Sequence, residues 1–313
     1  GEAARGATLY VNLEPCAHHG RTPPCAERVV ASGITRVVAS IQDPNPLVDG
    51  RGFRTLRAAG VQVDVGVLDT FARRLNADFL HWHEHGRPRV TLKTAVSLDG
   101  RTAAAGGASR WITNPLSRAF VHRLRTRFDA IVVGAGTVRA DDPSLDVRLP
   151  GISPRPVARV VLSSEGRLRA DARVFRDDGA PVLLYVAGPA GEIESRIPAH
   201  VTVVPATAKS GASIDVDAVL RDLGARGMQS VLIEGGSRTA GRFLEAGRID
   251  AVAWFRGTAL LGAGGGRPAL AAAAADAPGL APCARVEGRF AFGDDDLVIG
   301  RVVGARGMPC SPG

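Results

Sequence analysis

The chain has 313 residues, and its 45% apolar content is enough for two buried cores. The formal net charge is +8, but the basic residues are almost all Arg and are scattered, which argues against a nucleic-acid-binding protein and favours small anionic partners. No apolar run reaches the ~18 residues of a membrane span and no secretory pattern opens the chain, so we expect a cytoplasmic protein without a membrane partner.

Strand and helix patterns alternate in the first part of the chain. The predicted strands cover residues 7–13, 36–41 and 61–67, and the predicted helices cover residues 24–32, 52–59 and 70–85. The turn signal Gly86-Arg87-Pro88 then predicts a domain boundary, which gives domains of residues 1–87 and 88–313.

The second domain continues the alternation. Its predicted strands cover residues 89–95, 130–133, 158–162, 182–186, 201–204, 230–233, 251–259 and 289–303. Helices are predicted over residues 114–128, 214–225 and after Gly236, and the alanine run 271–275 is predicted as a loop or frayed helix. Short strands separated by helices predict an α/β fold with a parallel or mixed sheet.

Two cysteines in the first domain stand where a metal site is expected. Cys16 and Cys25 each follow a proline, at a strand end and at a helix start, where backbone dipoles favour thiolate. A catalytic zinc site in a nucleobase deaminase needs three protein ligands and a Glu that transfers protons. The fifteen residues before Cys16 contain no His. We therefore expect an incomplete zinc site, with a pair of small buried cysteines as the alternative.

Histidines near this motif have two interpretations each. His81 and His85 are one helical turn apart and have the spacing of a metal chelate, although a solvated helix end is favoured. His18 and His19 are either loop residues or groups that contact a pyrimidine or its phosphate.

Seven segments together resemble one enzyme family, the bifunctional deaminase/reductase of riboflavin biosynthesis. The resemblance rests on residues 14–25, 42–46, 50–52, 97–103, 109–113, 140–143 and 233–236. It implies that residues 1–87 are a fragment of a cytidine-deaminase-like domain, without the first strands and the H-x-E helix. It also implies that residues 88–313 form a dihydrofolate-reductase-like α/β domain.

A glycine turn joins a buried strand to a helix near residue 236. Backbone amides at a helix start favour an anion, although an ordinary glycine turn fits the pattern equally well when the family is set aside. With the resemblance, the turn is expected to hold the pyrophosphate of NADPH, assisted by Ser164. The residues of this expected cradle are Gly236, Ser237, Arg238, Thr239, Ala240, Gly241 and Arg242.

The resemblance implies further site residues. It places Ala95, Trp111, Thr137 and Asp141 near the cofactor, and Ser109, Arg125, Ser144, Leu145, Arg148 and Glu234 around the substrate. Planar guanidinium groups suit the substrate's phosphate, which we assign to Arg125 and Arg148. Lys93 is expected to polarise a pyrimidine carbonyl and Asp141 to orient the sugar or relay a proton. The alternatives are a surface charge for Lys93 and core packing for Trp111.

The function implied is NADPH-dependent reduction of the ribosyl side chain of 5-amino-6-(5-phosphoribosylamino)uracil to the ribityl form. The complete family enzyme would also deaminate the preceding diaminopyrimidinone phosphate with zinc, a step for which this chain lacks the parts. We expect a homo-oligomer. Three alternatives stay open: a reductase of the same fold that acts on a pterin, a fragment of a nucleic-acid base deaminase, and a scaffold without catalytic activity.

Overall fold

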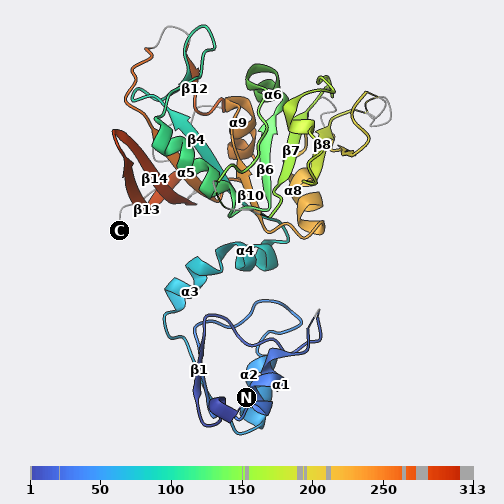
Figure 1. The fold of residues 1–313 in the computed structure, drawn as a ribbon, viewed down its shortest axis with the longest axis vertical. Helices are drawn as coiled ribbons and strands as arrows, with labels where there is room; N and C mark the ends of the chain where they lie inside the picture. The colour runs from blue at the N-terminus through green and yellow to red at the C-terminus, as the bar shows by residue number, and fades with distance from the viewer. Residues whose placement is uncertain are drawn as a thin grey trace. The chain divides into compact units, whose positions relative to one another are not determined.

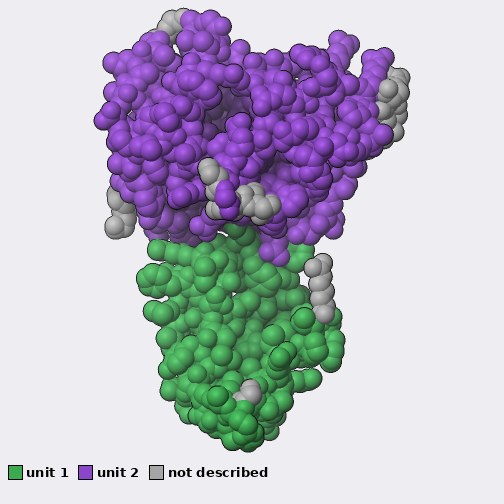
Figure 2. Space-filling view, viewed as in Figure 1, with its two compact units in different colours: residues 1–87 green, residues 88–313 purple. Residues whose placement is uncertain are grey.

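The computed structural model describes residues 2–20, 22–149, 151, 155–188, 193, 196–208, 213–262, 266–272 and 281–303. The chain divides into two compact units, unit 1 (residues 1–87) and unit 2 (residues 88–313), which Figure 2 draws in green and purple. Among the helices of these described residues, none is long and apolar enough to cross a membrane.

Unit 1 contains a three-stranded parallel sheet in the order β1-β2-β3. Two of its helices pack on the sheet through a small apolar core that includes Ala26, Val37 and Leu56. The strands and helices of unit 1 are η1 (Glu2–Ala4), β1 (Thr8–Val11), α1 (Cys25–Ala31), β2 (Arg36–Ala39), α2 (Arg51–Ala58), β3 (Gln62–Val65), α3 (Asp69–Leu75) and α4 (Ala77–His85).

The single helix predicted over residues 70–85 is wrong, because the structure has two helices that meet at Asn76. The backbone of Asn76 leaves the helical region, with φ −99° and ψ 18°. Its side-chain amide donates to the carbonyl oxygen of Ala72 at 2.9 Å. A side chain that bonds to nearby backbone competes with the helical pattern, which explains the break.

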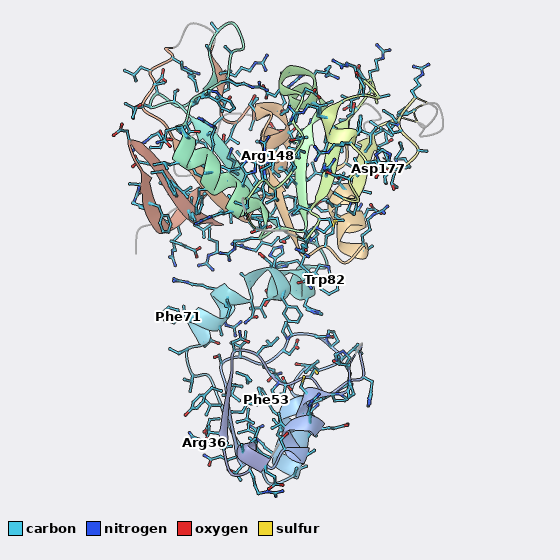
Figure 3. The ribbon with its side chains drawn as sticks, in the orientation of Figure 1. Arg36, Phe53, Phe71, Trp82, Arg148 and Asp177 are labelled. Atoms are coloured by element: carbon cyan, nitrogen blue, oxygen red, sulfur yellow. The ribbon has the colours of Figure 1, made fainter. Side chains whose placement is uncertain are left out.

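A buried carboxylate organises the loops of unit 1. Glu14 is 3% exposed and accepts backbone N–H bonds from Asp43 (3.2 Å), Gly50 (2.9 Å) and Phe53 (3.2 Å). Gly52 lies so close to this turn that a Cβ would come within 1.9 Å of the carbonyl oxygen of Pro15. Glu14 thus ties the loop after β2 to the start of α2, and Phe53 can be located in Figure 3.

Unit 2 is built on a nine-stranded sheet in the order β13-β14-β11-β4-β10-β6-β7-β8-β9. The strands from β11 to β9 run parallel to one another, and the β13–β14 hairpin adds antiparallel to β11 (Figure 1). The strands are β4 (Arg89–Val96), β6 (Ala130–Gly134), β7 (Ala158–Ser163), β8 (Val182–Val186), β9 (Val201–Pro205), β10 (Ser230–Ile233), β11 (Ala251–Arg256), β13 (Cys283–Phe292) and β14 (Asp295–Val303). The predicted α/β class is confirmed.

Helices pack on both faces of this sheet. One apolar cluster joins the sheet to α8 (Val216–Ala225) and α9 (Ser237–Glu245), and the other joins it to α5 (Pro115–Arg125) and α6 (Ala135–Asp141). Shorter elements are η2 (Arg173–Phe175) and the pair β5 (Arg101–Ala103) and β12 (Arg267–Pro268). Of the predicted alanine run 271–275, residues 271 and 272 are not helical and the rest lie outside the described residues.

The last predicted strand, residues 289–303, is also corrected. The chain turns between β13 and β14 at Gly293 and Asp294, and Gly293 has the positive φ of 61° that a tight hairpin turn demands. A Gly-Asp pair between two apolar alternating runs is a hairpin signal. The prediction of a single strand ignores this pair and therefore joins two strands into one.

We expect Glu14→Gln to lower the free energy of unfolding of unit 1 by about 1–3 kcal/mol, because an amide N–H₂ would then face buried N–H donors. Urea denaturation followed by fluorescence and circular dichroism measures this change. The control is Glu27→Gln on the exposed side of α1, which we expect to stay within about 0.5 kcal/mol of the wild type. Equal effects of the two substitutions would contradict the role of Glu14.

Candidate functional site

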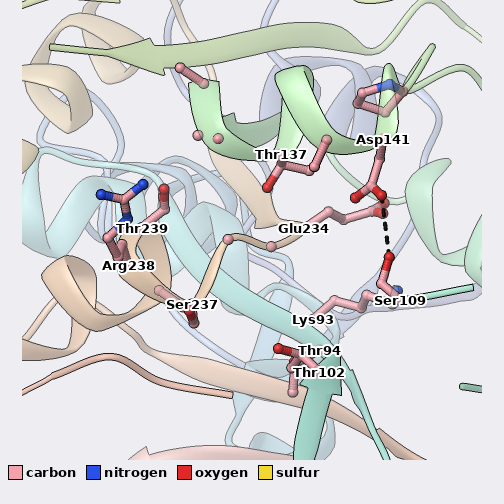
Figure 4. A pocket seen from close by; sticks show the side chains of 18 of the residues that line it. Lys93, Thr94, Thr102, Ser109, Thr137, Asp141, Glu234, Ser237, Arg238 and Thr239 are labelled. Carbon is pink, nitrogen blue, oxygen red and sulfur yellow. Dashed lines mark hydrogen bonds between the residues drawn. The ribbon is translucent and has the colours of Figure 1, made fainter. Parts of the chain in front are cut away.

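A large cavity opens at the carboxyl ends of the parallel strands of unit 2. Its volume is about 940 Å³, and its walls include the ends of β4, β6, β7 and β10. Strand β10 comes late in the chain but lies between β4 and β6, so the strand order reverses there. Ligands of open α/β sheets bind at such a reversal, outside the carboxyl ends of the strands. Figure 4 shows the cavity from close by.

The structure brings almost all of the predicted reductase residues together in this one cavity. It is lined by Lys93, Ala95, Ser109, Trp111, Arg125, Thr137, Asp141, Ser144, Leu145, Arg148, Ser164, Glu234, Gly236, Ser237, Arg238, Thr239, Ala240 and Arg242.

Gly241 is the predicted residue that does not line the cavity. It packs instead against the segment that follows β12, where a Cβ on Gly241 would come within 2.2 Å of the carbonyl oxygen of Ala271. Residue 241 therefore needs glycine for the close approach of two backbones. The sequence predicts a cofactor contact for Gly241 because this residue follows the glycine turn. In α9, however, Gly241 does not line the cavity.

Arg125 and Glu234 form a buried ion pair in the wall of the cavity. Arg125, at the end of α5, donates from Nε and Nη2 to the two carboxylate oxygens of Glu234 at 2.6 and 2.9 Å, and from Nη1 to the carbonyl oxygen of Asp146 at 2.7 Å. The two side chains are 12% and 7% exposed. Burial alone would raise the pKa of Glu234, but Arg125 and, more weakly, Lys93 lower it to about 2.

Lys93 lies on β4 beside this pair. Burial lowers the pKa of its ammonium group, and Glu234 counteracts that effect in part. Its Nζ is 5.7 Å from the centre of the Phe255 ring, and within the described part of the chain no hydrogen bond to it is present. An amine of this kind is a donor held ready for a ligand acceptor, as in sites where buried lysines are tuned for chemistry.

Asp141 closes the far side of the cavity at the end of α6. Its Oδ1 accepts from Ser109 Oγ at 3.2 Å, drawn as a dashed line in Figure 4, and its carbonyl oxygen accepts from Arg110 at 2.7 Å. Trp111 follows in the same segment and is 68% exposed, with the Arg118 guanidinium 4.2 Å from its ring centre. The core-packing alternative for Trp111 is wrong, since the ring is an exposed wall of the cavity.

The glycine turn has the geometry of a close-approach loop. Gly235 and Gly236 have φ of 105° and 77°, and α9 begins directly after them. A Cβ on Gly236 would lie 3.1 Å from Thr137 Oγ1, and one on Gly134 would lie 2.3 Å from Thr239 Oγ1. No side chain caps the start of α9, and the first amides of a helix have no intrahelical partner, which fits the binding of a dinucleotide pyrophosphate.

The lining is strongly cationic. Arg and Lys outnumber Asp and Glu in it by ten to four. Five of the lining arginines escaped the sequence analysis, because only the folded sheet brings them to the same edge: Arg110, Arg118, Arg139, Arg173 and Arg267. Such a surface favours ligands that carry several phosphates.

The two thiols of unit 1 lie together but do not complete a metal site. The Cys25 backbone N–H donates to Cys16 Sγ at 3.2 Å, and neither residue is buried, so the buried-cysteine alternative is wrong. Among the described residues no group of three His, Cys, Asp or Glu side chains is placed to hold a metal. Zinc with an open catalytic position needs three protein ligands, so the residues described do not fit it.

The predicted histidine pair of α4 is also part of a local cluster. The rings of His81 and His85 meet edge to face, with centroids 4.3 Å apart. His83 stacks on Phe79 and lies near Asp43, and burial lowers the pKa of His83. Trp82 of this helix is labelled in Figure 3. These contacts favour a packed helix end over a chelate.

Comparisons with known proteins point in one direction. Residues 88–281 match the family model described as the RibD C-terminal domain. A riboflavin biosynthesis protein RibD of Bacillus amyloliquefaciens is 41% identical over 262 residues, which cover 84% of this chain and 70% of that protein.

Two solved structures are similar over both units. Acinetobacter baumannii RibD matches with a TM-score of 0.86 and 34% identity, over 97% of this chain and 83% of that one. A Thermotoga maritima protein, named a diaminohydroxyphosphoribosylaminopyrimidine deaminase/5-amino-6-(5-phosphoribosylamino)uracil reductase, matches with a TM-score of 0.83 and 36% identity, over 96% of this chain and 80% of that one.

Removing Arg125 leaves the buried charge of Glu234 without its hydrogen-bonded partner. We expect Arg125→Met to lower the free energy of unfolding of unit 2 by about 3–5 kcal/mol, and Arg125→Met with Glu234→Gln to recover part of that loss. Urea denaturation of the single and double variants measures the coupling. Arg148→Met is the control, since Arg148 is 62% exposed. A double variant no more stable than Arg125→Met would contradict the pairing.

Proposed function

The chain belongs to the RibD family of riboflavin-biosynthesis proteins, and from this premise we propose that unit 2 reduces the ribosyl side chain of 5-amino-6-(5-phosphoribosylamino)uracil to ribityl with NADPH. The observation that carries the proposal is one cationic cavity that joins the glycine turn before α9 to Lys93, Asp141 and Arg148. Its volume of about 940 Å³ is at the upper end for ligand sites, as binding of a dinucleotide and a substrate together requires.

The cofactor half of the cavity is assigned to the turn at Gly235 and Gly236 and to the first turn of α9. NADPH, when bound, supplies the hydride, and the protein's part is to align it and to exclude competing reactions. The backbone amides after Gly236 hold the pyrophosphate, Arg238 and Arg242 neutralise phosphate charge, and the exposed face of Trp111 provides an apolar wall.

The substrate half is assigned to the residues at the other end of the cavity. The Lys93 ammonium donates to a pyrimidine carbonyl, and the fixed carboxylate of Glu234 accepts from ring N–H groups. Arg148 binds the ribose phosphate. Asp141, held by Ser109, orients the sugar hydroxyls and relays the proton that the opened ring oxygen needs when hydride reaches C1′. When the cofactor carries the chemistry, the protein accelerates the reaction mainly by aligning the two reactants.

The two arginines that are predicted to bind the substrate's phosphate differ in their hydrogen bonds and in their exposure. All three guanidinium nitrogens of Arg125 already donate to protein oxygens, whereas Arg148, labelled in Figure 3, is 62% exposed and lines the cavity. We therefore assign the phosphate mainly to Arg148. Arg125 contacts the substrate at most through its remaining N–H groups, and it holds Glu234 in place.

Deamination by this chain is not proposed. Unit 1 supplies Cys16 and Cys25, and its described residues offer no third ligand placed beside them. The pterin and base-deaminase alternatives lose their support, because family membership and the second half of the cavity both favour the riboflavin reductase. The homo-oligomer and the cytoplasmic location stay predictions.

The proposal is tested by NADPH consumption with the phosphoribosylamino-uracil substrate and by NADPH binding. We expect Gly236→Val to weaken NADPH binding at least about tenfold, because the side chain adds backbone strain and fills the approach to the pyrophosphate. Fluorescence titration of NADPH measures this without turnover. The matched control is Gly227→Val, where φ is 81° but no atom lies within 4 Å of the new Cβ. Equal weakening by both substitutions would overturn the assignment.

We also expect no ammonia from the diaminopyrimidinone phosphate when the 313-residue chain is given zinc, since the described residues of unit 1 offer no three-ligand site that could activate a hydroxide. A coupled ammonia assay measures this, and Cys16→Ser and Cys25→Ser should leave the reductase rate unchanged. Zinc-dependent ammonia release that either substitution abolishes would show that another residue completes the site.

A further inference from the structure

His122 lies on α5 one turn before Arg125 and contacts Arg148 through both ring nitrogens. Its Nδ1 is 3.2 Å from the backbone nitrogen of Arg148, which donates to it, and its Nε2 is 3.4 Å from Arg148 Nη2. The backbone of the predicted phosphate-binding residue is thus held by one imidazole, and its guanidinium lies against the other ring nitrogen.

The chemistry of these two contacts fixes the protonation state that they need. Both Arg148 groups are donors only, so an imidazole nitrogen must accept in each bond. A neutral imidazole has one acceptor nitrogen, and the backbone bond at Nδ1 places the proton on Nε2, so the contact with Nη2 is a close approach and not a second hydrogen bond. An imidazolium has no acceptor at all, and it would therefore lose its bond to Arg148.

The surroundings of His122 already oppose its protonation. Burial lowers the pKa of His122, as do Arg125 on the same helix and Arg148 on the loop after α6. The carbonyl and carboxylate of Asp146 raise it, and the Glu234 carboxylate also lies near the ring. The ring is therefore neutral at pH 7, and the Asp146 carbonyl that favours its protonated form already accepts from Arg125 at 2.7 Å.

We propose that His122 is a positioning residue of the reductase, which in its neutral form accepts from the backbone of Arg148 and so places that residue for the substrate's phosphate, a hold that protonation removes. This inference rests on the proposed function for the ligand, but the coupling between His122 and Arg148 belongs to the protein alone. This coupling predicts that the affinity for the phosphorylated substrate falls in acid by more than the titration of the phosphate alone would cause.

The kinetic test compares two substitutions. His122→Asn keeps an acceptor oxygen near the position of Nδ1 but cannot gain a proton, whereas His122→Leu removes the acceptor. At pH 7.5 we expect His122→Leu to raise KM for the phosphorylated substrate about tenfold with kcat largely kept, and His122→Asn to stay near the wild type. Neither should change KM for the dephosphorylated substrate.

The pH profile gives the decisive comparison. Between pH 7.5 and 5 the KM of the wild type should rise about tenfold more than that of His122→Asn, since the phosphate, whose own pKa is about 6, is common to both. Equal rises in the two proteins would overturn the inference, as would a loss in His122→Leu that is the same for both substrates.

A binding-free readout separates this inference from the proposed function. In the protein without ligands, the backbone amide resonance of Arg148 should shift with pH at the midpoint of the His122 ring, and the shift should vanish in His122→Asn. If the amide resonance of Arg148 does not shift at the midpoint of the His122 titration, the inference is overturned. A coupled amide in a protein that does not turn over the substrate would support it and refute the reductase assignment.

Discussion

The ion pair between Arg125 and Glu234 is the contact on which the architecture of the cavity depends. It joins the end of α5 to the end of β10, and the third bond of Arg125 fixes the loop at Asp146. Without the arginine, Glu234 would be a buried charge that either takes up a proton or pairs with Lys93. The pair therefore keeps Glu234 ionised and leaves the Lys93 ammonium for a ligand, so two groups of opposite charge stand ready at fixed positions.

Sheet topology explains why these groups meet although the sequence separates them widely. Lys93 precedes the end of β4, Asp141 ends the helix after β6, and Glu234 follows β10. Because β10 is inserted between β4 and β6 with parallel register, all three reach the same edge of the sheet. The helices that follow these strands then supply a covering layer, and α5 also carries Arg125 to the wall of the cavity and His122 next to Arg148.

The sequence predicted what is local and missed what depends on pairing. Apolar runs located the buried strands, and the glycines at 235 and 236 located the turn, since both signals lie within a few residues of chain. The break at Asn76 depends on the hydrogen bond of one side chain, and the hairpin at Gly293 depends on one Gly-Asp pair. The roles of Gly241, of the five additional arginines and of His122 had no local signal, because each depends on a neighbour from another strand or loop. The family resemblance, by contrast, named the Arg125 and Glu234 positions but not that they bind each other.

The charge of the cavity follows from how its acidic groups are used. Glu234 is bound by Arg125, Asp141 Oδ1 accepts from Ser109 Oγ, and an Asp142 carboxylate oxygen accepts from the Arg173 backbone at 2.9 Å. Three of the four acidic side chains of the lining are therefore satisfied by the protein, while most of the arginines are not bound to them. The surplus of positive charge is left for ligands, and both molecules of the proposed reaction carry phosphates at their far ends. In the proposed reaction, phosphate binding away from the reacting atoms then helps to align the hydride donor with its acceptor.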